Sequence, residues 1–121
     1  MKLLSSIGSS LLSLSALLLL GTTATSPAQA QTKYKCPSGY VCIYAENAYI
    51  DTSTPSNKYY RYGTYKLYNQ YNYHWVYNNQ TGGASVLLCK NSNGTNCPFT
   101  LYQGQYGYYD LTPINSIKLI E

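Results

Sequence analysis

The sequence has few charged side chains, a single histidine and no long apolar stretch beyond its first thirty residues. Of 121 residues, 8 are Lys or Arg, 4 are Asp or Glu and 1 is His. We find no paired carboxylates for acid–base catalysis, no nucleophile with a histidine base and no Gly-rich phosphate loop. These absences argue against an enzyme. The basic residues are scattered rather than clustered, which argues against nucleic acid as a partner.

The scarcity of acidic residues also argues against a metal or a cofactor. Calcium needs several hard oxygen ligands, and the acids Glu46, Asp51, Asp110 and Glu121 are spread along the chain. His74 has no second histidine beside it, and we expect it to be an exposed strand residue without a catalytic role. We therefore predict no metal ligands and no cofactor.

The first thirty residues have the pattern of a secretory signal peptide. Lys2 supplies a positive start, the apolar run LLSLSALLLL (11–20) follows, and SPAQA ends in a small-x-small site. We expect cleavage after Ala30, export from the cell and a mature chain, 31–121, that forms one domain. No later segment has the length of a membrane-spanning helix, so we expect no membrane association after cleavage. We also expect a monomer.

Four cysteines lie in the mature part of the chain: Cys36, Cys42, Cys89 and Cys97. An even number in a small exported domain predicts two disulfides. Three pairings are possible, and we favour the two that are close in sequence, Cys36–Cys42 and Cys89–Cys97. A zinc site is the alternative, but the spacings between the cysteines are not those of zinc ligands.

Tyrosine is the most conspicuous residue type, with 16 copies against one Trp and one Phe. Val, Ile and Thr are also frequent, and turn residues recur about every ten positions, which predicts an all-β sandwich or barrel. The predicted strands cover 41–45, 58–62, 71–77, 85–89, 99–102 and 115–120. Polar, Gly-, Pro- or Asn-containing loops separate them at 51–57, 78–84, 90–96 and 103–107.

The segment YNQYNYHWVYNN (68–79) places an aromatic residue at every second position from Tyr71 to Tyr77. On a strand, Tyr71, Tyr73, Trp75 and Tyr77 share one face. The first interpretation is that this row faces the core, with each hydroxyl directed to an edge or to water. Two alternatives stay open: a surface on which sugars stack, and the opposite register with Val76 inward.

A short motif occurs twice, as GTYKL (63–67) and GYYDL (107–111). Each copy follows a cysteine pair and precedes a polar turn and a strand. The chain therefore contains two copies of one supersecondary unit, at about 36–80 and 81–121. Two such copies suggest two Greek keys packed about a pseudo-twofold axis.

Longer segments resemble a known protein family. They are CPSGYVCIYAENAY (36–49), YRYGTYKL (60–67), VYNNQTGGA (76–84) and LTPINSIKL (111–119). In order and spacing they are similar to peptidase inhibitor family thirty-six, secreted bacterial metalloproteinase inhibitors with a βγ-crystallin-like fold. The resemblance covers nearly all of the mature chain. It implies two Greek keys in a β-sandwich, local disulfides and a non-catalytic protein that binds an extracellular protease, in the first place a metallopeptidase.

An inhibitor needs an exposed loop that is already held in its binding shape, because this reduces the entropy cost of binding. The segment LLCKNSNGTNCPF (87–99) fits, since a strand leads into a loop closed by Cys89–Cys97. We predict that Leu88, Cys89, Lys90 and Asn91 lie along the protease cleft as an extended substrate does. The bridge could instead only anchor a surface turn. Two other functions stay open: a carbohydrate or cell-wall glycan binding module that uses exposed tyrosines, and a secreted crystallin-like structural protein or small toxin.

Overall fold

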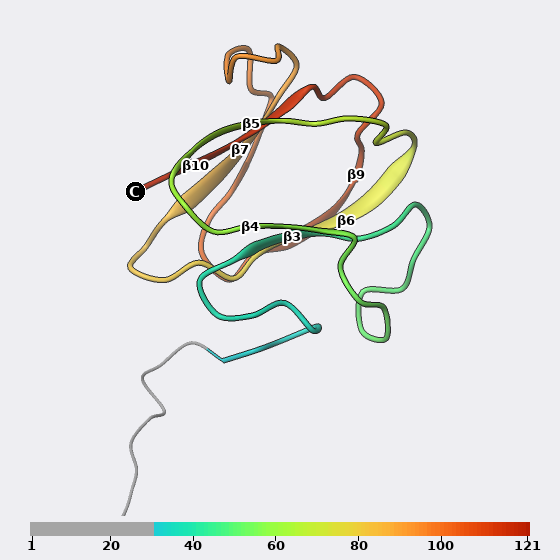
Figure 1. The fold of residues 1–121 in the computed structure, drawn as a ribbon, viewed down its shortest axis with the longest axis vertical. Coiled ribbons are helices and arrows are strands. Elements are labelled where there is room, and N and C mark those ends of the chain that lie inside the picture. The colour runs from blue at the N-terminus through green and yellow to red at the C-terminus, as the bar shows by residue number, and fades with distance from the viewer. Residues whose placement is uncertain (1–30) are drawn as a thin grey trace, which may run out of the picture.

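A computed structural model describes residues 31–121, which form strands, turns and loops. The predicted signal peptide and its cleavage site after Ala30 involve residues 1–30, which lie outside the described residues (Figure 1, grey). Within residues 31–121, no helix is long and apolar enough to cross a membrane.

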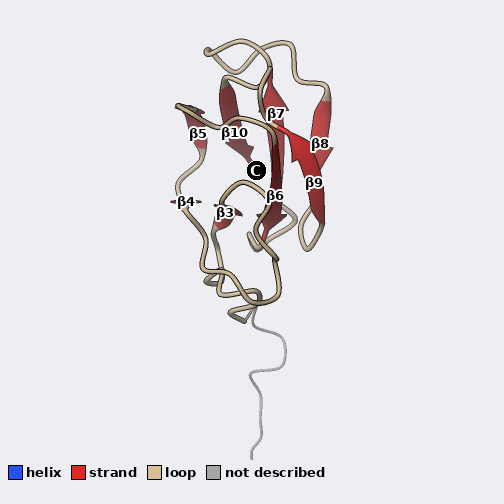
Figure 2. Ribbon diagram, turned by 90° about the vertical axis from the view of Figure 1, so that its right-hand side faces the viewer, coloured by secondary structure: helices blue, strands red, loops and turns tan. Residues whose placement is uncertain are grey.

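Eight strands form two four-stranded antiparallel sheets that face each other (Figure 2). The first sheet has the order β4-β3-β6-β9, and the second has the order β5-β10-β7-β8. The strands are β3 (Val41–Ile43), β4 (Asn57–Tyr59), β5 (Gly63–Lys66), β6 (Tyr73–Asn78), β7 (Ser85–Cys89), β8 (Phe99–Leu101), β9 (Tyr106–Asp110) and β10 (Ser116–Ile120). The predicted all-β sandwich is confirmed.

The six predicted strands are all present, with ends shifted by up to three residues, but two strands were missed. These are β5 and β9, and they coincide with the repeated segments 63–67 and 107–111. Neither strand has a fully buried residue, and both alternate between exposed and partly buried positions. Because both faces carry tyrosine, glycine or charged residues, the apolar periodicity that identifies a half-buried strand is weak here.

The two copies of the repeated motif occupy matching positions in the sandwich. β5 is the third strand of the first half of the chain, but it lies in the sheet formed by β7, β8 and β10 of the second half. In the same way, β9 is the third strand of the second half and lies in the sheet formed by β3, β4 and β6 of the first half. Tyr65 pairs with Tyr59 at 5.0 Å between ring centroids, and Tyr109 pairs with Phe99 at 4.8 Å. The tyrosine of each copy packs against the core, and the leucine that ends each copy is buried.

The main core lies between the two sheets and is aliphatic. Alternate residues of each strand point inward, as the pleat requires. The buried members are Val41, Ile43, Leu67, Val76, Val86, Leu88, Leu101, Leu111, Ile114, Ile117 and Leu119.

The aromatic row of β6 faces outward, so the prediction that its rings fill the core was wrong. Tyr71 and Tyr73 are 58% and 48% exposed, Trp75 is partly buried, and only Tyr77 is buried. Val76 is fully buried, which confirms the alternative register. The physical reason is space, because aliphatic side chains from both sheets already fill the interior, and a buried tyrosine would also need a partner for its hydroxyl.

His74 was predicted to be exposed, but its side chain is only 4% exposed. Its Nδ1 lies 2.6 Å from the backbone oxygen of Tyr44, and its Nε2 lies 2.8 Å from that of Tyr71. Carbonyl oxygens only accept, so both contacts are hydrogen bonds only when both ring nitrogens carry a proton. The ring connects β6 to the residue that follows β3 and to the turn that leads into β6 itself, which is a structural role.

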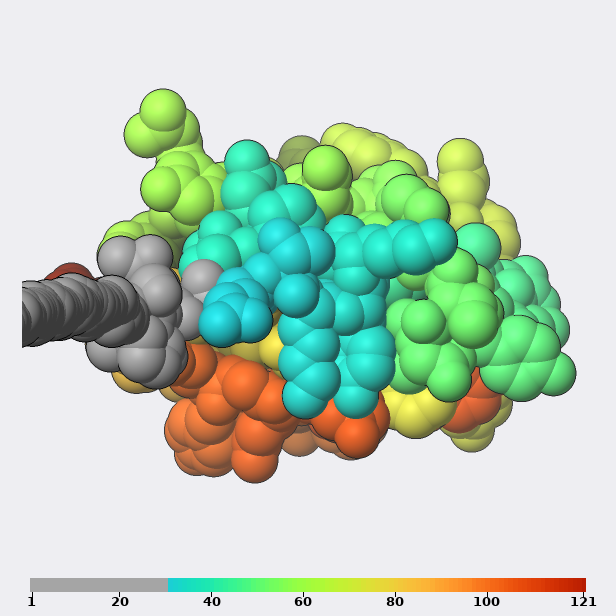
Figure 3. Space-filling model, turned by 90° about the horizontal axis from the view of Figure 1, so that it is seen from below, coloured from blue at the N-terminus to red at the C-terminus, as the bar shows by residue number. Residues whose placement is uncertain are grey.

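A second buried cluster explains why Tyr77 differs from the other rings of its row. The segment before β3 crosses the outer face of the first sheet, where the predicted Cys36–Cys42 bond is present with an S–S distance of 2.00 Å. Cys36, Cys42, Tyr44 and Tyr77 form a buried group there, and the Tyr44 hydroxyl donates to the Tyr34 carbonyl at 2.7 Å. The space-filling view shows this segment in blue to teal across the middle of the face (Figure 3).

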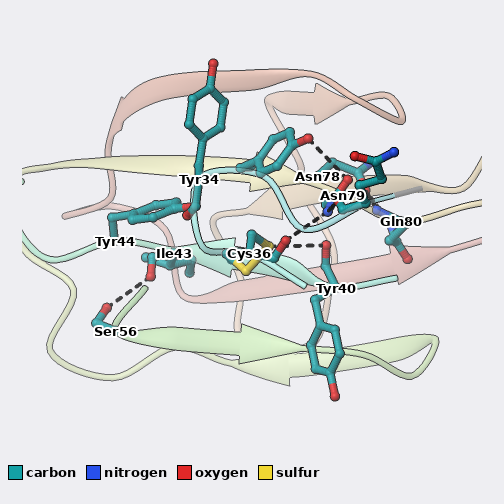
Figure 4. Close-up of a disulfide and its surroundings, with 12 residues drawn as sticks. Tyr34, Cys36, Tyr40, Ile43, Tyr44, Ser56, Asn78, Asn79 and Gln80 are labelled. Carbon is teal, nitrogen blue, oxygen red and sulfur yellow. Dashed lines mark hydrogen bonds between the residues drawn. A yellow bond between two sulfur atoms is a disulfide. The ribbon is translucent and has the colours of Figure 1, made fainter. Parts of the chain in front are cut away.

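The segment Asn78–Gln80, which was predicted to start a loop, is buried, and its side chains form a network of hydrogen bonds. The Asn78 amide donates to the carbonyls of Ala84 and Leu101 at 3.0 and 2.9 Å, and its Oδ1 accepts from the backbone and side-chain nitrogens of Gln80. The Asn79 amide donates to the Cys36 carbonyl at 2.9 Å (Figure 4). Asn78 thus joins the first sheet to β8 of the second, and Asn79 fastens the disulfide segment.

Candidate functional site: a disulfide-closed loop and an aromatic strip

The loop at residues 90–96 connects β7 to β8 and projects from one end of the sandwich (Figure 1, orange). The predicted Cys89–Cys97 bond closes its base, with an S–S distance of 2.01 Å. All of its residues are exposed except Gly94. The Lys90 N–H donates to the Asn96 carbonyl at 2.8 Å, and the Asn91 N–H donates to the Thr95 carbonyl at 3.2 Å. From Lys90 on, the chain is therefore a compact turn, whereas Leu88 and Cys89 of the predicted extended segment belong to strand β7.

Two side chains at the start of β10, those of Asn115 and Ser116, form hydrogen bonds with the backbone of this loop. The buried Ser116 hydroxyl donates to the Asn91 carbonyl and accepts from the Gly94 N–H at 3.1 Å. The Asn115 amide donates to the Lys90 carbonyl at 2.8 Å. Gly94 has a φ of +81°, and a Cβ at this position would lie 2.7 Å from the hydroxyl oxygen of Thr64, so a side chain there would be strained in both respects.

The four residues predicted to contact a protease are not equally accessible. Leu88 and Cys89 are fully buried, and the backbone of Leu88 is paired with Ile117 on one side and Phe99 on the other. Only Lys90 and Asn91 are exposed. Their N–H groups are bonded inside the loop, and their carbonyls accept from the side chains of Asn115 and Ser116. Contact with another protein can therefore involve the side chains of the turn, beginning at Lys90, but not Leu88.

A second candidate surface lies on the outer face of the first sheet, which we call the aromatic strip: Tyr73, Tyr108, Trp75 and Tyr106. Its ring centroids follow one another at 5.2, 5.0 and 5.8 Å in this order. Trp75 on β6 stands directly opposite Tyr108 on β9. The three tyrosines are 42–48% exposed. A sugar-stacking surface was the alternative interpretation of Tyr73 and Trp75. The sequence did not show which face of the strand is covered, or that β9 adds Tyr106 and Tyr108 to the same surface.

A cavity of about 530 Å³ joins the two candidate surfaces. Tyr73 and Tyr108 of the strip line one part of it, and Lys90, Pro98 and Phe99 at the base of the loop line another. Asp110 also lines it, and hydrogen bonds from the Thr112 hydroxyl and backbone N–H hold the pKa of this carboxyl below its usual value. The cavity therefore combines aromatic walls with a carboxylate that is ionised at neutral pH.

Metal-binding chemistry has no candidate site among residues 31–121. No group of three or more His, Cys, Asp or Glu side chains lies together there, and all four cysteines are in disulfides.

Comparisons of the chain with protein-family models, curated proteins and solved structures gave no match. The fold and the bonds define the class, which is a small all-β protein with two four-stranded antiparallel sheets and two disulfides.

Proposed function

We propose that the protein is a secreted inhibitor of extracellular peptidases, in the first place metallopeptidases, and that the loop at residues 90–96 is its contact surface. The observation that carries the proposal is that this loop is exposed and yet anchored by a disulfide, two cross-loop hydrogen bonds and the Ser116 hydroxyl. A loop that is already ordered loses little conformational entropy when it binds.

The compact shape of the loop favours an inhibitor over a substrate. A peptide that lies along a binding cleft as an added strand uses its backbone N–H and C=O groups. The amide groups of Lys90 and Asn91 are bonded within the loop, so the chain cannot be drawn into the extended form without breaking these bonds. Inhibition would then come from side chains of the turn that block the cleft, with Lys90 and Asn91 as the first contacts.

We also propose that the sandwich consists of two Greek keys, as expected for this inhibitor family. In the first sheet, β6, β3 and β4 are the fourth, first and second strands of the first half, and β10, β7 and β8 repeat this order in the second sheet. A Greek key has the spatial order 4-1-2-3. Two keys, at about 36–80 and 81–121, that each place their third strand in the opposite sheet would give this arrangement and a βγ-crystallin-like sandwich. Export with cleavage after Ala30 fits a monomeric domain with two disulfides.

The test is a titration of the oxidised protein, residues 31–121, against a thermolysin-like metallopeptidase, a serine peptidase and a cysteine peptidase. We expect stoichiometric inhibition of the metallopeptidase. If none of the three classes is inhibited at micromolar concentrations, the proposal fails.

A variant of the loop support tests the contact surface. Ser116→Ala removes the hydroxyl that holds Asn91 and Gly94, so the free loop becomes more mobile and inhibition should weaken about tenfold. Ser56→Ala is the matched control, because its hydroxyl also donates to a backbone carbonyl, that of Ile43, far from the loop along the chain. Equal inhibition by wild type, Ser116→Ala and Lys90→Ala would exclude the loop as the contact surface.

A further inference from the structure

We propose that the aromatic strip is a binding site for an uncharged glycan chain. The proposal does not depend on the peptidase inhibitor function, because the four rings of the strip lie outside the loop at residues 90–96; Lys90 is the one loop residue that lines the cavity at the end of the strip. It rests on the outward position of the rings, on their linear arrangement and on the absence of cationic side chains from the two strands that carry them.

The strip has the length of an oligosaccharide site. Its rings follow β6 and β9, and its last ring, Tyr106, stands on β9 opposite position 77 of β6. From Tyr73 to Tyr106 the strip therefore covers about 13 Å along the strands, at roughly 3.3 Å per residue. Neighbouring rings are 5.0–5.8 Å apart, so there is no gap between them. The strip continues past Tyr73 and Tyr108 into the cavity of about 530 Å³, which gives the chain of sugars a defined end.

The chemistry of the strip suits a sugar chain. A pyranose ring presents C–H groups on its faces and hydroxyls around its edge, so it stacks on an aromatic ring and needs hydrogen-bond partners at the side. Tyrosine provides both an apolar ring and a polar group. The rim is also polar and held in place, since the Tyr108 hydroxyl donates to Asn47 Oδ1 at 3.0 Å and the Asn72 amide donates to Glu46 at 2.8 Å. Asp110 supplies a further acceptor at the cavity end.

The charge pattern disfavours the other ligands that stack on aromatic rings. Single-stranded nucleic acid needs Lys or Arg along its phosphates in addition to stacking rings. An anionic lipid surface calls for Lys or Arg beside the apolar and aromatic side chains that insert. The sequences of β6, YHWVYN, and of β9, YGYYD, contain neither Lys nor Arg, and their one aliphatic residue, Val76, is buried. An uncharged, hydroxyl-rich chain is the ligand that this surface complements.

The experiment measures retention of the oxidised protein on chitin, cellulose and peptidoglycan at low and at high salt. We expect retention on at least one of them that persists at high salt. Trp75 is the only tryptophan in the sequence and lies within the strip, so soluble fragments of the retained polymer should shift its fluorescence. Retention that salt abolishes would mean adsorption of a basic protein to acidic groups, and it would overturn the proposal.

Matched tyrosine variants locate the site. Tyr73→Ala and Tyr108→Ala should each weaken binding about tenfold, by analogy with the loss of one stacked base, whereas Tyr108→Phe should keep most of it. Tyr49→Ala and Tyr68→Ala are the controls, because these residues are 77% and 70% exposed outside the strip. Equal losses in variants and controls, or retention on none of the polymers, would overturn the proposal. The proposal would also be overturned if removing protein from the wall material by digestion abolished retention, while digesting the glycan left retention unchanged.

Two cross-tests separate this inference from the proposed function. The strip variants should inhibit the peptidase as wild type does, and Ser116→Ala should bind the glycan as wild type does. Failure of glycan binding with normal inhibition removes only the glycan site, and the reverse result removes only the inhibitor.

Discussion

Replacing Asn78 by alanine should remove a large part of the free energy of unfolding. The Asn78 side chain is fully buried and makes four hydrogen bonds, two as donor to the carbonyls of Ala84 and Leu101 and two as acceptor from Gln80. A hydrogen bond contributes about 1 kcal/mol net, and each buried group that is left without a partner costs about 1–3 kcal/mol. Since water that enters the vacated space recovers part of this, we expect a loss of about 3–5 kcal/mol.

The expected loss is large in relation to the whole domain. Small domains have about 0.05–0.15 kcal/mol of stability per residue, which gives roughly 5–14 kcal/mol for residues 31–121. Urea unfolding of the oxidised protein, followed by Trp75 fluorescence, would show the loss as a lower midpoint at an unchanged slope. A loss below about 1 kcal/mol would refute the role of Asn78 as the link between the sheets.

Two further variants distinguish hydrogen bonding from side-chain volume. Asn78→Asp keeps the shape of the side chain, but an ionised carboxylate cannot donate to the carbonyls of Ala84 and Leu101, so it should destabilise the domain at least as much as alanine does. Asn93→Ala changes an exposed asparagine of the loop and should stay within about 0.5 kcal/mol of wild type.

Two pH dependences follow from the perturbed side chains. The pKa of Asp110 is lowered by its hydrogen bonds with Thr112, so its contribution to stability is present above the unfolded pKa of about 3.9 and is lost as pH falls through the folded value. Asp110→Asn should therefore lower the unfolding midpoint at neutral pH, and a difference from wild type that persists at the acid limit would contradict this. Burial also raises the pKa of four tyrosines: Tyr44, Tyr59, Tyr77 and Tyr109. The stability that they contribute is present below the unfolded pKa of about 10 and is lost as pH rises through the raised values. In an alkaline titration, tyrosinate absorbance should appear in two phases, the second together with the loss of circular dichroism, whereas a single phase with intact sheets would refute it.

The sequence was sufficient to predict the fold class, six strands and both disulfides, because these depend on local signals. Tyrosine, valine and isoleucine favour strands, Gly- and Asn-rich segments mark turns, and the paired cysteines are close along the chain. β5 and β9 were missed because their burial alternates only between exposed and partly buried residues. Their edge-type pattern is recognisable only when the partner strands are known.

The orientation of β6 could not be predicted from the strand itself. Alternation assigns residues to two faces, but the more apolar face was taken as the inner one. The inner face contains His74, Val76 and Asn78, two of which are polar. They can be buried because carbonyls accept from them, and two of these carbonyls, those of Tyr44 and Leu101, come from distant positions in the chain. Burial of a polar residue depends on such partners, and these are known only after the chain has folded.

The burial of the predicted contact residues also depends on partner strands that the sequence does not identify. The disulfide identified the loop at residues 90–96, but not the residue at which strand pairing ends. Val86 and Leu88 alternate within the predicted strand at 85–89, which already placed both on one face. The alternation does not say which face is buried, and the compact turn held by Ser116 requires knowledge of β10.

The outer face of β6 is covered at one end and exposed at the other, because the segment before β3 packs over only part of it. Tyr77 lies under this segment, beside Cys36 and Cys42, and its environment is that of a core residue. Tyr73 lies four residues away on the same face, is 48% exposed and packs against the ring of Tyr108. Substitution of Tyr77 therefore reports on stability, while substitution of Tyr73 reports on what the surface binds. The spacing of the aromatic residues is the same in both parts, so cover by a distant segment, rather than residue type, decides between the two roles.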